Sequence, residues 1–270
     1  MSSSAIPETV RQPAVAGQFY PSQPDKLREM VDGFMNRAPV QAWGRPKAVI
    51  APHAGYIYSG PIAASSFAHF VTDKATIKRI ILLGPSHRYW FEGIALTRAD
   101  ALATPFGAVP VDKEAVNQIR KLPQVQFEER AHTNEHSLEV ELPFLQQTLG
   151  EFTIVPLVVG EAGAEAIAEV IEQVWGGDET RLVISSDLSH YHDYETARTL
   201  DRRTADAIEN FEPQQIKGDR ACGHIPIRGL LHAAQARKLS AKAVDLRNSG
   251  DTAGSRGQVV GYGAFVFNQN

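Results

Sequence analysis

The chain has 270 residues, 43% of them hydrophobic and 21% charged, with a formal net charge of −4, so it offers no strongly basic surface for nucleic acid. No apolar run approaches the roughly 18–20 residues that a membrane-spanning helix needs, and the first residues lack the basic and apolar regions of a secretory signal. Because Cys222 is the single cysteine, an internal disulfide is excluded, and we expect a cytoplasmic protein without nucleic-acid or membrane partners.

Strands and helices are predicted to alternate along the chain. Residues 1–12 are expected to be loosely ordered, and residues 13–270 are expected to form one domain that opens with an extended segment at 13–21. Short apolar runs predict strands at 47–51, 79–83, 93–98, 108–111, 152–159, 182–185 and 261–267. Apolar residues at helical spacing predict helices at 25–37, 61–70, 112–121, 161–174, 194–210 and 227–237.

This alternation is typical of an α/β fold with a central, mostly parallel sheet that helices flank. The turn at 104–107 is expected to pair the strands 93–98 and 108–111 as a hairpin, which would make the sheet mixed. Asp112 is the expected N-cap of the helix that follows.

Side chains that can bind metal follow three of the predicted strands: His53 after 47–51, His87 after 79–83, and Asp187 and His190 after 182–185. In open α/β sheets, ligands bind beyond the carboxyl ends of the strands. If the three strands are parallel neighbours, these side chains converge on one crevice. A lone histidine after a strand is usually an ordinary loop residue, but the repetition at equivalent positions favours a site.

Cys222 is a further candidate ligand, because it precedes the helix predicted at 227–237. A helix N-terminus favours the thiolate form, although many lone cysteines are simply small buried apolar residues. Imidazole and thiolate together suit iron, copper or zinc rather than magnesium or calcium. A metal held by His53, His87 and Cys222 would keep open positions for water, oxygen or substrate.

His136 is expected in the same pocket. His132 lies four residues before it and would share its face on a helix, but Thr133 and Asn134 are typical cap residues that would separate the two. We therefore interpret His136 as a pocket residue with Glu135 as its orienting partner.

Five blocks of the sequence resemble, in order, the Memo family, whose bacterial members are also called AmmeMemoRadiSam system protein B. The blocks are Ala51–Tyr56, Gly84–His87, Glu135–Glu139, Ser185–Tyr191 and Cys222–Gly223, and the resemblance extends over about residues 10–267. It implies a fold similar to that of the class III extradiol dioxygenases, non-haem iron enzymes that cleave catechol rings with iron held by two histidines and a glutamate.

The resemblance also implies roles for individual residues. His53 and His87 match the histidine positions, and Cys222 stands where the glutamate would be. Asp187, His190 and His136 match other pocket residues, which makes them candidates for catalytic or supporting roles. A thiolate is a softer and more oxidisable donor than a carboxylate, so the resemblance does not by itself transfer dioxygenase activity.

Three functions remain open from the sequence. The first is a redox enzyme with iron(II), or else copper or zinc, in which His136 or His190 acts as acid or base. The second is a binding module for a peptide or a small ligand; Tyr56 and Tyr58 could line a phenolic pocket, or they could pack a helix on the sheet. The third is a metal-free enzyme with Cys222 as nucleophile. The family name further implies a functional link to a radical-SAM protein.

Overall fold

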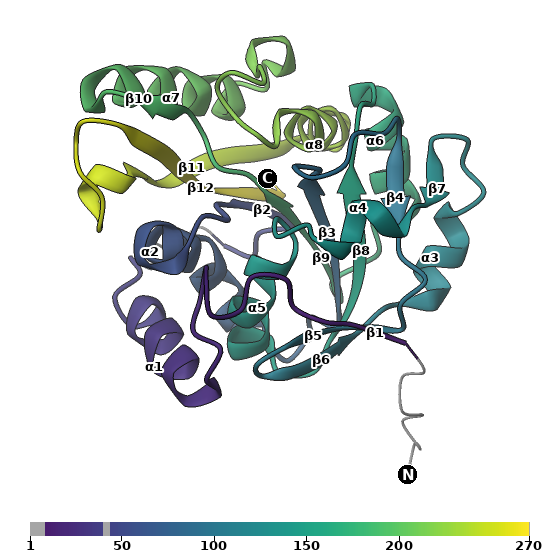
Figure 1. Ribbon diagram of the computed structural model, residues 1–270. Helices are drawn as coiled ribbons and strands as arrows, with labels where there is room; N and C mark the ends of the chain where they lie inside the picture. Colours follow the sequence, from purple (N-terminus) through teal and green to yellow (C-terminus); the bar gives the residue numbers. More distant parts are fainter. Residues whose placement is uncertain (1–8, 40–43, 270) are drawn as a thin grey trace.

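The computed structural model describes residues 9–39 and 44–269, in which a central sheet is covered by helices (Figure 1). Within these residues the main sheet has nine strands. Its path runs through β10 (His190–His192), β12 (Val259–Gln269), β2 (Ala48–Ala51), β9 (Thr180–Ser185), β3 (Arg79–Pro85), β8 (Thr153–Val159), β4 (Ile94–Leu96) and β7 (Val125–Phe127), and β11 (Leu239–Asn248) also pairs with β12.

The helices form layers against this sheet. Figure 1 shows α1, α2 and α5 on one side of it and α6, α7 and α8 on the other. The helices are α1 (Pro24–Met35), α2 (Tyr56–Phe67), α3 (Lys113–Ile119), α4 (Glu129–Thr133), α5 (Leu142–Leu149), α6 (Ala164–Gln173), α7 (Tyr194–Glu209) and α8 (His224–Ala236). No helix in the part of the chain that the structure describes is long and apolar enough to cross a membrane.

The prediction of a mixed α/β fold flanked by helices is confirmed. The centre is parallel, because β9 pairs in parallel with both β2 and β3, and β3 with β8. Antiparallel pairs lie toward the edges, between β12 and β2 and between β4 and β8. The central strands are buried on both faces, which explains why they read as continuous runs of Ile, Leu and Val.

The predicted hairpin has a different partner strand. Its second strand, β6 (Gly107–Pro110), pairs antiparallel with β5 (Ala101–Thr104), and not with residues 93–98. Residues 94–96 instead form β4, which joins the main sheet beside β8 and β7. The turn at 104–107 therefore connects two strands of a separate small sheet, to which β1 (Val10–Arg11) adds a third strand in the described residues.

The N-terminal segment is fixed from its ninth residue onward. Residues 1–8 of the segment that we expected to be loosely ordered lie outside the described residues. Within the rest of it, Val10 and Arg11 pair with β5, and the Arg11 guanidinium donates to the carbonyl of His132 and to the carboxylate of Glu139. The domain boundary at residue 13 stays a prediction.

Candidate metal centre

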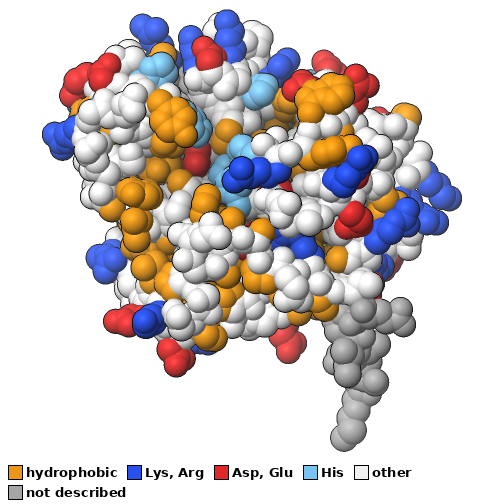
Figure 2. Space-filling model, viewed as in Figure 1, with side chains coloured by type: hydrophobic (Ala, Val, Ile, Leu, Met, Phe, Trp, Pro, Cys, Tyr) orange, Lys and Arg blue, Asp and Glu red, His pale blue; other side chains and the backbone are white. Residues whose placement is uncertain are grey.

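The three strands that precede the candidate residues are neighbours in the sheet. β2, β9 and β3 lie side by side in this order and are all parallel, as is needed for their loops to meet. Their carboxyl ends therefore deliver the loops with His53, with Asp187 and with His87 to one edge of the sheet. Figure 2 shows histidine side chains in a hollow of the molecular surface on this face.

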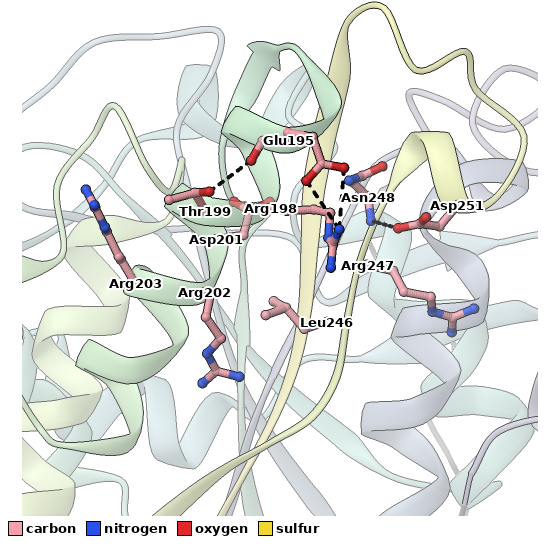
Figure 3. A pocket seen from close by; sticks show the side chains of 10 residues that line it. All are labelled: Glu195, Arg198, Thr199, Asp201, Arg202, Arg203, Leu246, Arg247, Asn248 and Asp251. Atoms are coloured by element: carbon pink, nitrogen blue, oxygen red, sulfur yellow. Dashed lines mark hydrogen bonds and ion pairs between the residues drawn. The ribbon is translucent and has the colours of Figure 1, made fainter.

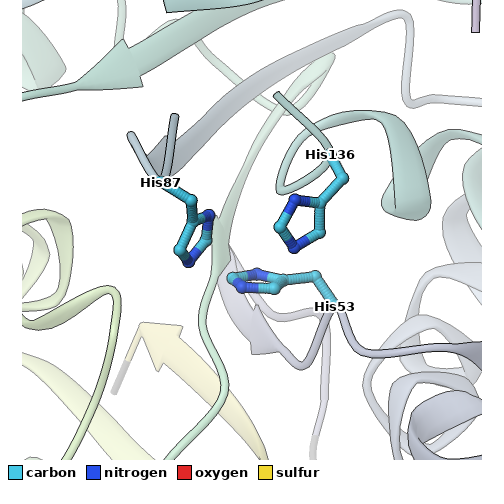
Figure 4. A group of neighbouring side chains, drawn as sticks. All are labelled: His53, His87 and His136. Atoms are coloured by element: carbon cyan, nitrogen blue, oxygen red, sulfur yellow. The ribbon is translucent and has the colours of Figure 1, made fainter. Parts of the chain in front are cut away.

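Three histidines form the core of the site. His53, His87 and His136 each offer one ring nitrogen, and these nitrogens lie within 4.8 Å of one another. The rings point toward a common space (Figure 4), with centroids 4.7 Å apart for His87 and His136 and 5.2 Å apart for His53 and His87. His53 is buried and His87 is exposed, so the cluster opens to solvent on the His87 side.

His53 is held at both its backbone and its ring. Its backbone N–H donates to Asp187 Oδ1 over 2.8 Å, and its ring Nδ1 lies 2.6 Å from Ser185 Oγ, in the last residue of β9. This leaves Nε2 directed toward the crevice, 3.3 Å from Cys222 Sγ. Burial, together with the neighbouring histidines, lowers the pKa of His53 well below its usual value, so its imidazole is neutral.

Glu135 holds the other two histidines. Its Oε1 lies 2.9 Å from Nδ1 of His87 and 3.3 Å from Nδ1 of His136, but only the first contact has hydrogen-bond geometry. Burial opposes ionisation of Glu135, yet the hydrogen bonds from His87 and Ser137 lower its pKa to about 2. Glu135 thus contacts His136 as expected, but its stronger partner is His87. Burial lowers the pKa of His136 to about 4.

Cys222 reaches the crevice from the opposite wall. It comes immediately before Gly223, the N-cap of α8, and its Sγ accepts from the backbone N–H of Asp187 over 3.2 Å. A Cβ on Gly223 would lie 2.6 Å from Ser186 Cβ and 2.8 Å from the carbonyl oxygen of Ser185, so glycine lets this loop approach β9 closely.

The ionisation of Cys222 differs from our expectation. The helix N-terminus was expected to favour the thiolate, but burial and the nearby Asp187 carboxyl raise the thiol pKa above its usual value. The desolvation of the charged form is larger here than the effect of the helix end. The thiol is therefore protonated at neutral pH in the metal-free protein.

Asp187 and His190 lie beside the cluster. Asp187 accepts a hydrogen bond from the His53 backbone, and within residues 9–39 and 44–269 its carboxyl group forms no hydrogen bond or ion pair with an imidazole. Burial raises its pKa to about 7. His190 is half-buried on β10, and burial lowers its pKa. It lies outside the histidine group that could hold a metal in the described part of the chain. Tyr56 is buried and donates to the carbonyl of Val140, which favours the packing role for this residue.

Sequence reasoning missed two residues that hold His53 in place. Ser185 touches the His53 ring directly, and Glu141 contacts Ser185 with its Oε1 at 2.7 Å. In the sequence, Ser185 is only a small polar residue at the end of a predicted strand. Glu141 is only an acidic residue close to two other glutamates, Glu135 and Glu139. A charged side chain in a stretch that is otherwise apolar, such as Val140 to Leu145, was the available signal.

The donor set fits a transition metal. A ligating imidazole usually has its second nitrogen fixed by an oxygen, as His53 and His87 have here. The separation of 3.3 Å between His53 Nε2 and Cys222 Sγ is compatible with two donors on one ion, given bonds of about 2.0–2.1 Å to nitrogen and about 2.3 Å to sulfur. The residues present could therefore hold a metal.

A pocket elsewhere on the molecule offers no comparable chemistry. It measures about 510 Å³ and lies between α7 and β11, lined by arginines and acidic residues (Figure 3). Three of its arginines pair within the chain: Arg198 with Glu195, Arg202 with Asp206 and Arg247 with Asp245. The histidine crevice is the better candidate site.

Comparisons with known proteins find similar sequences that match nearly the whole chain. The family model described as Memo-like protein matches residues 11–266. A MEMO1 family protein of Aquifex aeolicus is 36% identical over 269 residues, covering 96% of this chain and 99% of its own. A MEMO1 family protein of Methanopyrus kandleri is 35% identical over 289 residues, covering 95% and 98%. The crystal structure of the uncharacterized protein JW3007 from Escherichia coli K12 has a TM-score of 0.52 at 12% identity, covers 82% of this chain and all of its own, and shares the fold.

Proposed function

This chain belongs to the Memo family, and we propose that its histidine crevice binds one transition-metal ion and uses it in redox chemistry on a small ligand. The observation that carries the proposal is the convergence of His53, His87 and His136, whose ring nitrogens lie within 4.8 Å of one another. His53 and His87 are both fixed through Nδ1, which orients them for binding through Nε2, and His53 is neutral, so little rearrangement is needed to receive an ion.

The proposed ligands are His53, His87 and Cys222. Support comes from the short contact between Cys222 Sγ and His53 Nε2, which brings the thiol to the free side of that ring. His136 has no hydrogen bond at Nδ1 to fix its orientation, so it suits a group that gives or takes a proton. We propose His190 as a second acid or base at the edge of the crevice, and Asp187 as the carboxyl group that supports the site.

Iron(II) is the proposed metal, with copper and zinc as the alternatives that the same donors suit. When bound, it would supply an open coordination position for oxygen or for the hydroxyl of a phenolic ligand. The chain's own residues would exclude water behind His53, and the neutral imidazole of His136 would accept a proton from the ligand. We propose a cytoplasmic setting, where reducing conditions keep a lone thiol available.

A metal-free enzyme with Cys222 as nucleophile is a second candidate, because the thiol lies 3.3 Å from an imidazole. That mechanism needs a thiolate beside an imidazolium. Here burial raises the pKa of Cys222 and lowers the pKa of His53, so both shifts oppose such a pair. The electrostatics favour the metal site.

Metal analysis tests the proposal directly. Protein purified without oxygen and loaded with iron(II) should hold one ion per chain, and His53→Ala or His87→Ala should abolish this binding. His232→Ala is the matched control, since His232 is an exposed histidine on α8. Full metal content in both crevice variants would contradict the site.

Turnover is tested separately from binding. Oxygen consumption by the iron-loaded protein should rise in the presence of a catechol or another phenol, and His136→Ala should lower the rate by about 10²–10⁴-fold. Metal binding without oxygen consumption across the panel would favour a ligand- or peptide-binding role for the crevice over an enzymatic one.

A further inference from the structure

The Ser185 hydroxyl makes three short polar contacts behind His53. Its Oγ lies 2.6 Å from Nδ1 of His53, 2.6 Å from the carbonyl oxygen of Ser137 and 2.7 Å from Oε1 of Glu141. Ser185 and Glu141 are both fully buried. All three distances are hydrogen-bond distances, and a buried polar atom gains by having a partner, so we interpret each contact as a hydrogen bond.

The number of protons decides the direction of each bond. A hydroxyl donates one hydrogen bond and accepts two, and a backbone carbonyl can only accept. The Ser185 proton must then point to the Ser137 carbonyl. Both remaining neighbours have to donate to Ser185 Oγ, so His53 carries a proton on Nδ1 and Glu141 carries a proton on its carboxyl group.

We propose that Glu141 is a positioning residue that stays a neutral carboxylic acid and, through Ser185, holds His53 in the Nδ1–H form with its Nε2 lone pair facing the crevice. An ionised Glu141 would draw the Ser185 proton to itself. The Ser137 carbonyl oxygen would then face a hydroxyl lone pair at 2.6 Å, which is repulsive.

The surroundings of Glu141 agree with a neutral form. Burial raises its pKa well above the usual range, and the nearby Asp187 adds to this effect. Among the described residues, Glu141 forms none of the ion pairs with Lys, Arg or His that would favour its charged state. Its position is fixed because it ends the short 3-10 helix η2 (Glu139–Glu141), directly before α5.

The inference deepens the proposed function in one respect only, namely how the chain prepares His53 for a metal. The protonation of Glu141 and the tautomer of His53 are properties of the metal-free protein. They can therefore be measured whether or not the crevice binds a metal, and the two proposals can fail independently.

The protonation state is tested by infrared spectroscopy on the metal-free protein between pH 7 and 9. The difference spectrum of wild type and Glu141→Gln should contain the carbonyl band of a protonated carboxyl group. Glu165→Gln, which changes an exposed residue of α6, should lack it. Absence of the band at pH 7, which would mean that Glu141 is already ionised there, would overturn the inference.

The tautomer is tested by nitrogen NMR of histidine-labelled protein. His53 should carry its proton on Nδ1 in wild type and in Glu141→Gln, whose amide N–H can replace the donor. Ser185→Ala removes the acceptor and should give a mixture of both tautomers. An Nε2–H form in wild type would overturn the inference.

Metal affinity supplies the last readout, with zinc as the probe. Glu141→Gln should stay within about threefold of wild type, whereas Glu141→Ala and Ser185→Ala should bind about 10–100-fold more weakly. A large loss in Glu141→Gln would mean that a negative charge at this position matters, which contradicts a neutral acid. Failure of wild type to bind zinc would refute the metal site and leave the spectroscopic results standing.

Discussion

Burial sets the ionisation of the groups around the histidine cluster. It lowers the pKa of His53 and of His136, and it raises the pKa of Cys222 and of Asp187. Glu135 is the exception, since its hydrogen bonds outweigh its burial. The metal-free crevice therefore offers neutral imidazoles at His53 and His136 and a protonated thiol, and a bound cation would compensate the charge of Glu135.

The third ligand can be identified by counting protons. If Cys222 binds as a thiolate, the ion must displace a proton that the raised pKa holds firmly, so metal affinity should rise about tenfold per pH unit from pH 7 to 9. If His136 binds instead, its pKa of about 4 leaves it neutral over that range, and it releases no proton.

Calorimetry in buffers of different ionisation enthalpy measures the proton count for zinc. We expect one proton released by wild type and none by Cys222→Ser, which should also bind more weakly. Zero release by wild type would reassign the third position to His136.

Asp187 should cost stability at high pH. Its folded pKa of about 7 lies above the ordinary value of 3.8, so the folded protein binds this proton more tightly than the unfolded chain. The contribution is favourable below pH 4 and is lost as the pH rises through 7. Asp187→Asn keeps an acceptor for the His53 N–H but has no charge, so it should melt at a higher temperature than wild type at pH 8, by a margin that shrinks as the pH falls to 5.

Thermal melts between pH 5 and 8 check this difference, with the exposed Asp178→Asn as control. The same Asp187→Asn variant should bind metal about 10–100-fold more weakly, because it removes a negative charge beside the ion. A melting difference that does not change with pH would mean that Asp187 is ionised throughout.

At the scale of elements, the segment from Glu135 to Glu141 organises the whole site. Every second residue of this segment faces inward. Glu135 binds His87, and Glu139 binds the N-terminal segment. The Ser137 carbonyl accepts a hydrogen bond from the Ser185 hydroxyl, which Glu141 also contacts. Four buried polar residues in seven would be destabilising without these partners. The segment therefore links the histidine crevice to the N-terminus.

Glu139 fixes that N-terminal segment. Its carboxylate accepts from the backbone N–H groups of Ala14 and Val15, from the Tyr20 hydroxyl and from Arg11. Glu139→Gln would turn an amide toward these donors and should destabilise the protein by about 3–5 kcal/mol, as for a broken buried ion pair.

Urea unfolding measures this loss, and hydrogen exchange should show faster exchange of the amides of residues 14–20. Because the Phe19 ring packs 4.8 Å from the ring of His136, the same change should increase the exposure of the crevice. The exposed pair of Glu195 and Arg198 gives the control, in which Glu195→Gln should cost less than about 1 kcal/mol. Equal losses in both variants would refute the role of Glu139.

The elements that could be predicted are those whose pattern is local. β2 is apolar throughout and β3 and β9 have apolar centres, and Asp112 accepts a hydrogen bond from Ala115 N as an N-cap should. β11 was missed because it alternates small and charged residues on a half-exposed face, with a bulge between Ala243 and Asp245 that breaks the alternation. The partner of β6 was missed although it directly precedes the turn, because the run Ala101–Thr104 is short and rich in alanine, which is a weak strand signal.

Some residues of the candidate site could likewise be predicted from the sequence and others could not. His53 and His87 could be found because each follows a strand end, and parallel neighbours bring such ends together. The roles of Ser185 and Glu141 could not, since they depend on contacts across about 44 residues of sequence. A hydroxyl at the end of a buried strand has no signature until its neighbours are known.

At the scale of the whole molecule, the crevice gathers side chains from well-separated parts of the chain. His53 follows β2, His87 follows β3, His136 belongs to the segment before η2, and Cys222 precedes α8. An ion bound there would connect the central strands to the helices on both sides of the sheet. Metal should therefore stabilise the fold as a whole, because the unfolded chain holds these residues far apart.

The size of that stabilisation follows from mass action. At a free metal concentration 100 times the dissociation constant, binding to the folded state adds about 2.7 kcal/mol. For a chain of this length, each kcal/mol raises the melting temperature by about 2–4 °C, so zinc should raise it by about 5–10 °C. Without metal, His87→Ala should melt below wild type, because it removes the Nδ1 hydrogen bond to the buried carboxylate of Glu135, and on addition of zinc it should show no shift. The exposed His232→Ala should keep it in full. A shift of equal size in His87→Ala would mean that zinc stabilises the protein from another position, and it would refute the crevice as the metal site.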